Sequence, residues 1–184
     1  LNATEKNVAL SQDIEDNIPS ILGNFDLLLQ VFDNLLGNGL KFSPKNSNLM
    51  IRAYTWPDSC PALPPTNKNY KAPQCELVSP LPKVRIEIAD TGSGISQTDQ
   101  EKIFDRFFRV ENAVHTEQGT GLGLSIVRGI VEKHGGEIRM ASEVGVGTTF
   151  WFDLALAQSD KDEILTQSIN NNETFSASEA SKII

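Results

Sequence analysis

Cysteine is scarce in this chain, because its 184 residues include only Cys60 and Cys75. Two cysteines do not make a disulfide framework, so we expect a reducing compartment and two free thiols. The less favoured alternative is a bond between them, which would close a loop of about 15 residues and contribute roughly 3 kcal/mol.

Long hydrophobic runs and an excess of positive charge are also missing. No stretch approaches the roughly 18 apolar residues of a membrane span, and no signal-peptide pattern is present. The formal net charge of −8 argues against a nucleic-acid partner. Because the chain begins with Leu1, we expect it to be a piece of a longer protein.

Two stretches have no periodic pattern of apolar residues. Residues 57–82 are rich in proline, which predicts a loop insertion, and the polar residues 158–184 predict a disordered tail. We therefore expect one domain, residues 1–157, followed by that tail.

The remaining sequence alternates between strand and helix patterns. Apolar residues at helical spacing predict a helix over 25–40, which Pro44 would stop. A second helix over 124–136 would end at Gly135 and Gly136, and Ser96 would be the N-cap of a short helix over 97–105. Alternating patterns predict strands, at an edge over 6–14, then over 48–56 and 83–89, and finally a hairpin across the segment "VGVG".

The first helix has a polar strip in the segment "DNLLGNGLK". At 100° per residue, Asn38 projects about 40° to one side of Asn34 and Lys41 about 20° to the other side. A solvated helix face would explain the strip alone. Its functional interpretation is that Asn38 offers an amide oxygen to Mg²⁺ and Lys41 offers a charge to phosphate.

Two glycine-containing segments add to this strip. Asp90 ends a predicted strand before "TGSG", where a carboxylate could accept a hydrogen bond from an amino group and glycines would let a flat ring approach. The alternation Gly119, Gly121, Gly123 leads into a helix, whose N-terminal N–H groups suit phosphate. Each segment alone has a simpler explanation, a common turn or a hinge, but together they indicate an ATP site.

These motifs resemble the catalytic and ATP-binding domain of sensor histidine kinases. "DNLLGNGLKFSP" resembles the N box, "DTGSGI" the first glycine box, "IFDRFFRV" the F box and "GTGLGLSIV" the second glycine box. The resemblance covers roughly residues 5–156. It implies an α/β two-layer sandwich of the Bergerat type, in which helices cover one face of a mixed, mostly antiparallel sheet.

The resemblance also implies roles for single residues. Asn38 would bind Mg²⁺, Asn34 and Lys41 would border the phosphates, and Arg109 would approach the γ-phosphate. Residues 96–120 would form a mobile lid anchored by Phe104 and Phe107. The implied nucleotide contacts are Phe42, Asp90, Gly92, Gly94, Ile95, Phe107, Gly119, Thr120, Gly121, Leu122, Gly123, Leu124 and Thr148.

The implied partners are a dimerisation domain with the acceptor histidine and a response-regulator receiver domain. Neither His115 nor His134 lies in the family's acceptor pattern, so we expect that domain to lie outside this chain, and we expect His134 only to interact with a helix dipole. The implied location is the cytoplasm, or the cytoplasmic side of a membrane-anchored sensor. We expect this fragment itself to make no membrane contact.

Two alternatives share the motifs: a hydrolysing ATPase of the gyrase and chaperone type, and a nucleotide-binding signalling module without catalysis. The related hydrolases have a Glu four residues before the metal-binding Asn, where this chain has Asn34. An amide cannot accept a proton from water, so Asn34 favours transfer to a histidine.

Overall fold

The computed structural model describes residues 6–56, 83–110, 120–157 and 173–175. A five-stranded sheet has the order β1-β3-β4-β6-β5. Its strands are β1 (Ala9–Ile14), β3 (Asn48–Trp56), β4 (Lys83–Asp90), β5 (Arg139–Glu143) and β6 (Gly147–Ala155). Edge strand β1 is parallel to β3, and the other pairs are antiparallel. This is the predicted mixed sheet.

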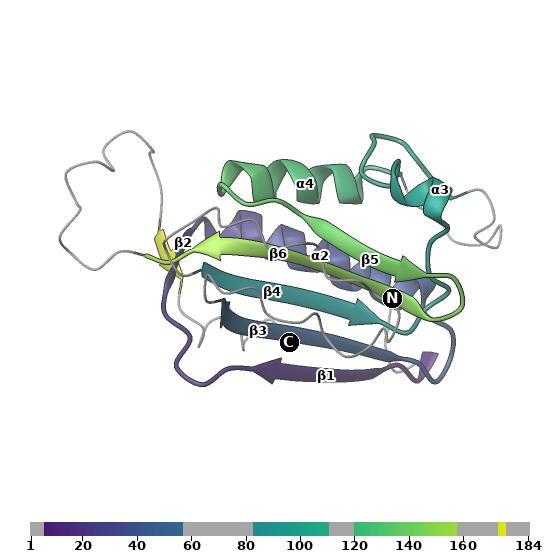
Figure 1. Ribbon diagram of the computed structural model, residues 1–184, viewed down its shortest axis with the longest axis horizontal. Helices are drawn as coiled ribbons and strands as arrows, with labels where there is room; N and C mark the ends of the chain where they lie inside the picture. The colour runs from purple at the N-terminus through teal and green to yellow at the C-terminus, as the bar shows by residue number, and fades with distance from the viewer. Residues whose placement is uncertain (1–5, 57–82, 111–119, 158–172, 176–184) are drawn as a thin grey trace.

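Helices α2 (Phe25–Phe42) and α4 (Gly123–Lys133) run along the sheet and pack against each other (Figure 1). The predicted helix over 25–40 is thus confirmed and runs to residue 42. Asn24 begins it, because its side-chain oxygen accepts from the backbone N–H of Leu27. Gly39 is buried, and a Cβ there would lie 2.6 Å from Leu49 Cδ1, so α2 approaches β3 closely at this turn.

The core lies between the helices and one face of the sheet. Val84, Ile86 and Ile88 point from β4 toward α2 and α4, as their alternation predicts. Each aliphatic side chain buried in this way contributes about 1.5–3 kcal/mol. The core therefore holds α2 and α4 in fixed positions, and these two helices carry most of the motifs.

The opposite face of the sheet contains charged residues that are nevertheless buried. Arg85 donates two hydrogen bonds to Asp153, of 2.6 and 2.9 Å, and Glu87 accepts one of 2.6 Å from the Tyr54 hydroxyl. Burial first, and then the hydrogen bond to Glu87, raise the pKa of Tyr54 above its ordinary value. The alternation in β4 predicted which way Arg85 and Glu87 point but not that they are buried.

Two elements differ from the sequence predictions. Helix α3 (Gln97–Gln100) begins after the predicted N-cap Ser96 but is only four residues long. Residues of the predicted disordered tail form β7 (Glu173–Phe175), which pairs antiparallel with β2 (Ile21–Gly23). The edge of β2 offers backbone hydrogen-bond partners to another strand. The polar composition of residues 158–184 does not predict that pairing. The rest of 158–184 and all of the insertion 57–82 lie outside the described residues.

Candidate nucleotide site

The polar strip lies on the C-terminal half of α2. Asn34, Asn38 and Lys41 are all half-buried, so they border the interior without entering it. The side chain of Asn38 makes no hydrogen bond with the rest of the described chain, which leaves its oxygen free to bind a ligand. The ammonium of Lys41 lies 5.1 Å from the ring centroid of Phe42, which is 41% exposed.

Asn34 faces the start of α4. Its Nδ2 donates to the backbone oxygen of Gln30 over 2.8 Å. Its Oδ1 lies 2.7 Å from where a Cβ on Gly123 would be. The end of the Asn34 side chain therefore lies close to Gly123, the first residue of α4. Among the described residues, no side chain caps the N-terminus of α4, and its first N–H groups are suited to an anion.

Asp90 forms the other side of the candidate site, at the end of β4 and opposite Thr148 of β6. Its Oδ1 accepts from the backbone N–H of Gly92 over 2.8 Å. Burial raises the pKa of Asp90, while backbone hydrogen bonds from Gly92 and Thr148 oppose that rise. A half-buried carboxylate in such an environment is a strong acceptor for a ligand amino group.

The first glycine segment is fixed between α2 and the β5–β6 hairpin. A Cβ on Gly92 would lie 2.6 Å from Asp90 Oδ1 and 2.9 Å from the Phe42 carbonyl oxygen. Gly94 has φ +68°, and a Cβ there would overlap the backbone of Glu143. Ile95 packs against the core and donates its N–H to Ser142 Oγ over 2.8 Å. The "DTGSGI" segment is thus held rigidly beside Phe42.

The second glycine segment meets the residues that follow α3. Gly121 has φ +70°, and a Cβ there would lie 2.8 Å from the carbonyl carbon of Phe107. The carbonyl oxygen of Gly121 accepts a hydrogen bond of 2.9 Å from the backbone N–H of Phe107. Leu122 and Leu124 follow, the latter packed against the core, and Thr120 is exposed. Gly119 lies outside the described residues.

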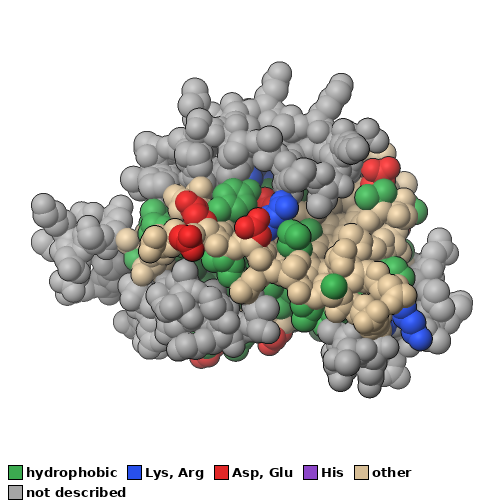
Figure 2. Space-filling view, turned by 90° about the horizontal axis from the view of Figure 1, so that it is seen from below, with side chains coloured by type: hydrophobic (Ala, Val, Ile, Leu, Met, Phe, Trp, Pro, Cys, Tyr) green, Lys and Arg blue, Asp and Glu red, His purple; other side chains and the backbone are tan. Residues whose placement is uncertain are grey.

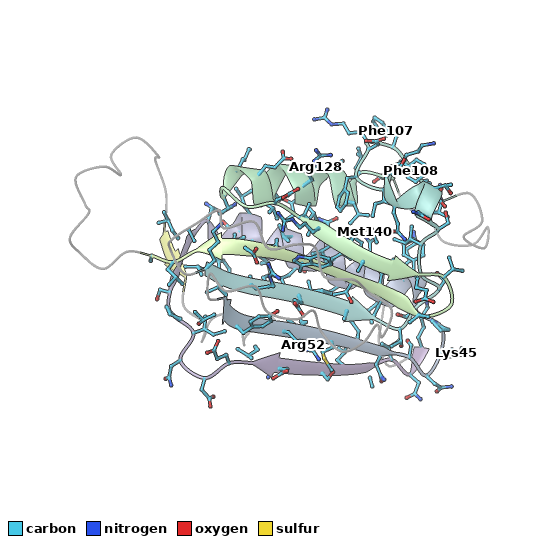
Figure 3. The ribbon with its side chains drawn as sticks, in the orientation of Figure 1. Lys45, Arg52, Phe107, Phe108, Arg128 and Met140 are labelled. Atoms are coloured by element: carbon cyan, nitrogen blue, oxygen red, sulfur yellow. The ribbon has the colours of Figure 1, made fainter. Side chains whose placement is uncertain are left out.

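The prediction that Phe107 anchors the lid is wrong for this structure. Phe104 docks edge-on against Phe150, with ring centroids 6.3 Å apart, and Phe108 packs against the core. Phe107 is 71% exposed with φ +65° and points outward above α3 (Figure 3). Its backbone bond with Gly121 fixes that orientation, so Phe104 and Phe108 serve as the anchors. Arg109 is exposed too, and its approach to a phosphate stays a prediction.

Sequence reasoning missed two residues that hold α2. His134 does more than interact with a helix dipole, because its Nε2 accepts from the backbone N–H of Asn24. Lys6 donates to the carbonyl oxygens of Leu40 and Lys41. The sequence indicated only that His134 lies at the end of a helix, before Gly135. No motif includes Lys6, so nothing in the sequence pointed to its contacts with α2.

Known proteins resemble this chain in sequence and in fold. The family model described as "Histidine kinase-, DNA gyrase B-, and HSP90-like ATPase" matches residues 23–158. Drug sensory protein A from Synechocystis is 49% identical over 86% of this chain and 22% of its own length. An uncharacterized sensor-like histidine kinase ycf26 from Pyropia yezoensis is 47% identical over 86% of this chain and 22% of its length.

A solved structure of full-length ShkA in complex with AMPPNP superposes with a TM-score of 0.61 at 26% identity, over 85% of this chain and 28% of that one. The chain spans about a fifth of the length of the two curated relatives named above.

Within the described residues, no helix is both long and apolar enough to cross a bilayer. On the face drawn in Figure 2, acidic side chains lie beside the basic group near its centre, and the described residues form no broad basic area there.

Proposed function

Because the chain belongs to the histidine kinase, DNA gyrase B and HSP90-like ATPase family, we propose that it transfers the γ-phosphate of Mg-ATP to a histidine on a dimerisation domain. It would be the ATP-binding catalytic domain of a sensor histidine kinase. The runner-up functions are ATP hydrolysis and nucleotide binding without catalysis.

The contact between Asn34 and Gly123 carries the proposal. It brings the polar strip of α2 against the uncapped N-terminus of α4, where a triphosphate would find both a dipole and side-chain donors. The same proximity argues against hydrolysis, because the α2 side chain that lies beside Gly123 is a carboxamide. An amide cannot take a proton from an attacking water, whereas a histidine acceptor is itself a nucleophile.

The other site residues have roles that follow from their chemistry. Asn38 would hold Mg²⁺, which prefers oxygen ligands and often takes only one or two from the protein. Bound Mg²⁺ would neutralise charge on the phosphates. Lys41 and Arg109 would also neutralise charge on the phosphates. Correct positioning of the reacting groups would supply the rest of the rate enhancement. Asp90 would accept from the adenine amino group.

The partners are proposals of the same kind. The dimerisation domain would supply the acceptor histidine, and a receiver domain would take the phosphoryl group from it. Because this chemistry uses cellular ATP, we place the domain in the cytoplasm or on the cytoplasmic side of a membrane-anchored sensor.

One set of assays separates the three functions. Calorimetry with Mg-ATP tests binding, a phosphate-release assay tests hydrolysis, and labelled ATP tests transfer to a purified dimerisation domain. We expect binding, negligible release and transfer. Rapid release by the pure chain would favour the hydrolase, and binding without transfer to a folded acceptor would favour the signalling module.

A further inference from the structure

The C-terminal end of α2 is closed by residues from three parts of the chain. The last four carbonyl groups of a helix have no partner within it. Here the Gly39 oxygen accepts from the Ser43 N–H over 3.1 Å, and the Phe42 oxygen accepts from the Ser93 N–H over 3.4 Å. The Leu40 and Lys41 oxygens both accept from the ammonium of Lys6, over 3.1 and 2.7 Å.

The backbone around Lys6 is held by the connection between α2 and β3. Its carbonyl oxygen accepts from the Asn46 N–H over 3.2 Å. The next residue, Asn7, donates from Nδ2 to Asn46 Oδ1 over 2.6 Å. Ala9, at the start of β1, donates to the Ser47 oxygen over 2.9 Å. The segment that enters β1 is therefore bound to the connection between α2 and β3.

One of the two peptide groups that Lys6 binds belongs to Lys41, a residue of the candidate nucleotide site, and the next residue is Phe42. Lys41 and Phe42 form the last turn of α2, and the carbonyl of Lys41 is the closer partner of the ammonium. A cation at this end also complements the negative end of the helix dipole. Without Lys6, two carbonyls would lose a charged donor, and the last turn would fray more readily.

We propose that Lys6 is a positioning residue for the nucleotide site, through which the segment entering β1 sets the affinity for ATP. This inference rests on the proposed function. Lys6 would act without contacting the nucleotide, by fixing the turn that orients Lys41 and Phe42. A displacement of this segment would then weaken nucleotide binding without changing any residue of the site.

The test compares substitutions of two lysines at the same end of the sheet. Lys6→Met removes the charge and keeps the length, and Lys6→Arg keeps the charge. Lys45→Met is the control, because Lys45 is exposed in the connection between α2 and β3 (Figure 3). Amide exchange at Ser43, measured by NMR without nucleotide, reports the last turn directly. Calorimetry with Mg-ATP reports the site, below the melting temperature of each variant.

We expect Lys6→Met to speed Ser43 exchange and to weaken ATP binding by about tenfold, since two hydrogen bonds from a charged donor are lost. Lys6→Arg should retain most of the parent's Ser43 protection and ATP affinity. Lys45→Met should match the parent in both measurements. If Lys6→Met melts too low, Lys6→Gln replaces it.

Two results would overturn the inference: unchanged Ser43 exchange in the neutral variants, or faster exchange with unchanged ATP affinity. A parent chain that binds no ATP would instead contradict the proposed function. Exchange would then still decide whether Lys6 holds the turn.

Discussion

His134 Nε2 accepts a hydrogen bond of 3.0 Å from the backbone N–H of Asn24. His134 follows the last residue of α4, and Asn24 is the N-cap of α2, so the imidazole joins opposite ends of the two site helices. Nε2 can accept only if Nδ1 carries the ring proton, and Nδ1 lies 2.8 Å from the Ile130 carbonyl oxygen. The neutral ring therefore fits between a donor and an acceptor.

Replacing His134 by Phe should lower the free energy of unfolding by about 1–3 kcal/mol, because the buried N–H of Asn24 loses its acceptor. His134→Gln, whose side-chain oxygen can reach a similar position, should retain most of the stability. Urea unfolding followed by circular dichroism measures both. Equal stabilities of the Phe and Gln variants would mean that ring packing, and not the hydrogen bond, matters at this position.

The buried pair of Arg85 and Asp153 offers a second stability test. Asp153→Ala leaves the Arg85 guanidinium, with 7% of its side chain exposed, without its two acceptors. We expect a loss of about 1–3 kcal/mol, because a buried guanidinium loses both hydrogen bonds to its carboxylate partner. Thermal and urea unfolding give the value.

The control is the exposed pair of Arg139 and Glu137, whose N–O distance of 2.7 Å is equally short. Arg139→Ala should change the stability by less than about 1 kcal/mol, because solvent screens exposed pairs. Similar losses in the two variants would show that burial does not distinguish the pairs.

The sequence predicted the elements with strong periodicity and missed the links between them. Apolar spacing in α2 and β4 reflects burial against the core, so both were predicted nearly to their ends. Phe107 and Phe108 are adjacent aromatics, and only the positive φ of Phe107 decides which of them faces the core. The contacts of Lys6 and His134 join residues that lie 34 to 110 positions apart, and no local pattern encodes these contacts.

The Asp90→Asn variant should bind ATP at least about tenfold more weakly, because the amide nitrogen replaces a carboxylate oxygen that would accept from the adenine amino group. The preference for ATP over GTP should also narrow, since guanine presents a carbonyl at that place. Calorimetry with both nucleotides measures this. Unchanged ATP affinity would show that Asp90 is only a turn residue.

The same variant makes a separate prediction about stability and pH. A carboxyl whose pKa is raised on folding contributes most stability below its unfolded pKa of about 3.9, and that contribution is lost as the pH rises through the folded pKa. As the pH rises toward neutral, the charged form of this half-buried carboxyl therefore costs stability, and Asn removes the cost. We expect the nucleotide-free variant to be at least as stable as the parent at pH 7, with the difference shrinking toward pH 3. Urea unfolding at both pH values checks the sign, and a variant less stable than the parent at pH 7 would contradict it.

Asn38→Ala and Asn38→Asp should both abolish phosphotransfer while the domain stays folded. Alanine removes the amide oxygen that would bind Mg²⁺. Aspartate keeps an oxygen but adds a negative charge beside the triphosphate, and that repulsion is strong where water is partly excluded. The strip is only half-buried and Asn38 bonds to no other described side chain, so each change should alter the unfolding free energy by about 0.5 kcal/mol.

The matched control for Asn38 is Asp33→Asn, an exposed position on the same helix outside the strip. Labelled ATP and a purified dimerisation domain give the transfer rate, and thermal melting confirms folding. Raising the Mg²⁺ concentration adds a readout, because a weakened metal site should recover part of its activity at high Mg²⁺. If the Asn38 variants melt normally and transfer phosphate as fast as Asp33→Asn, then Asn34, Asn38 and Lys41 are a solvated helix face, and the metal must be held elsewhere.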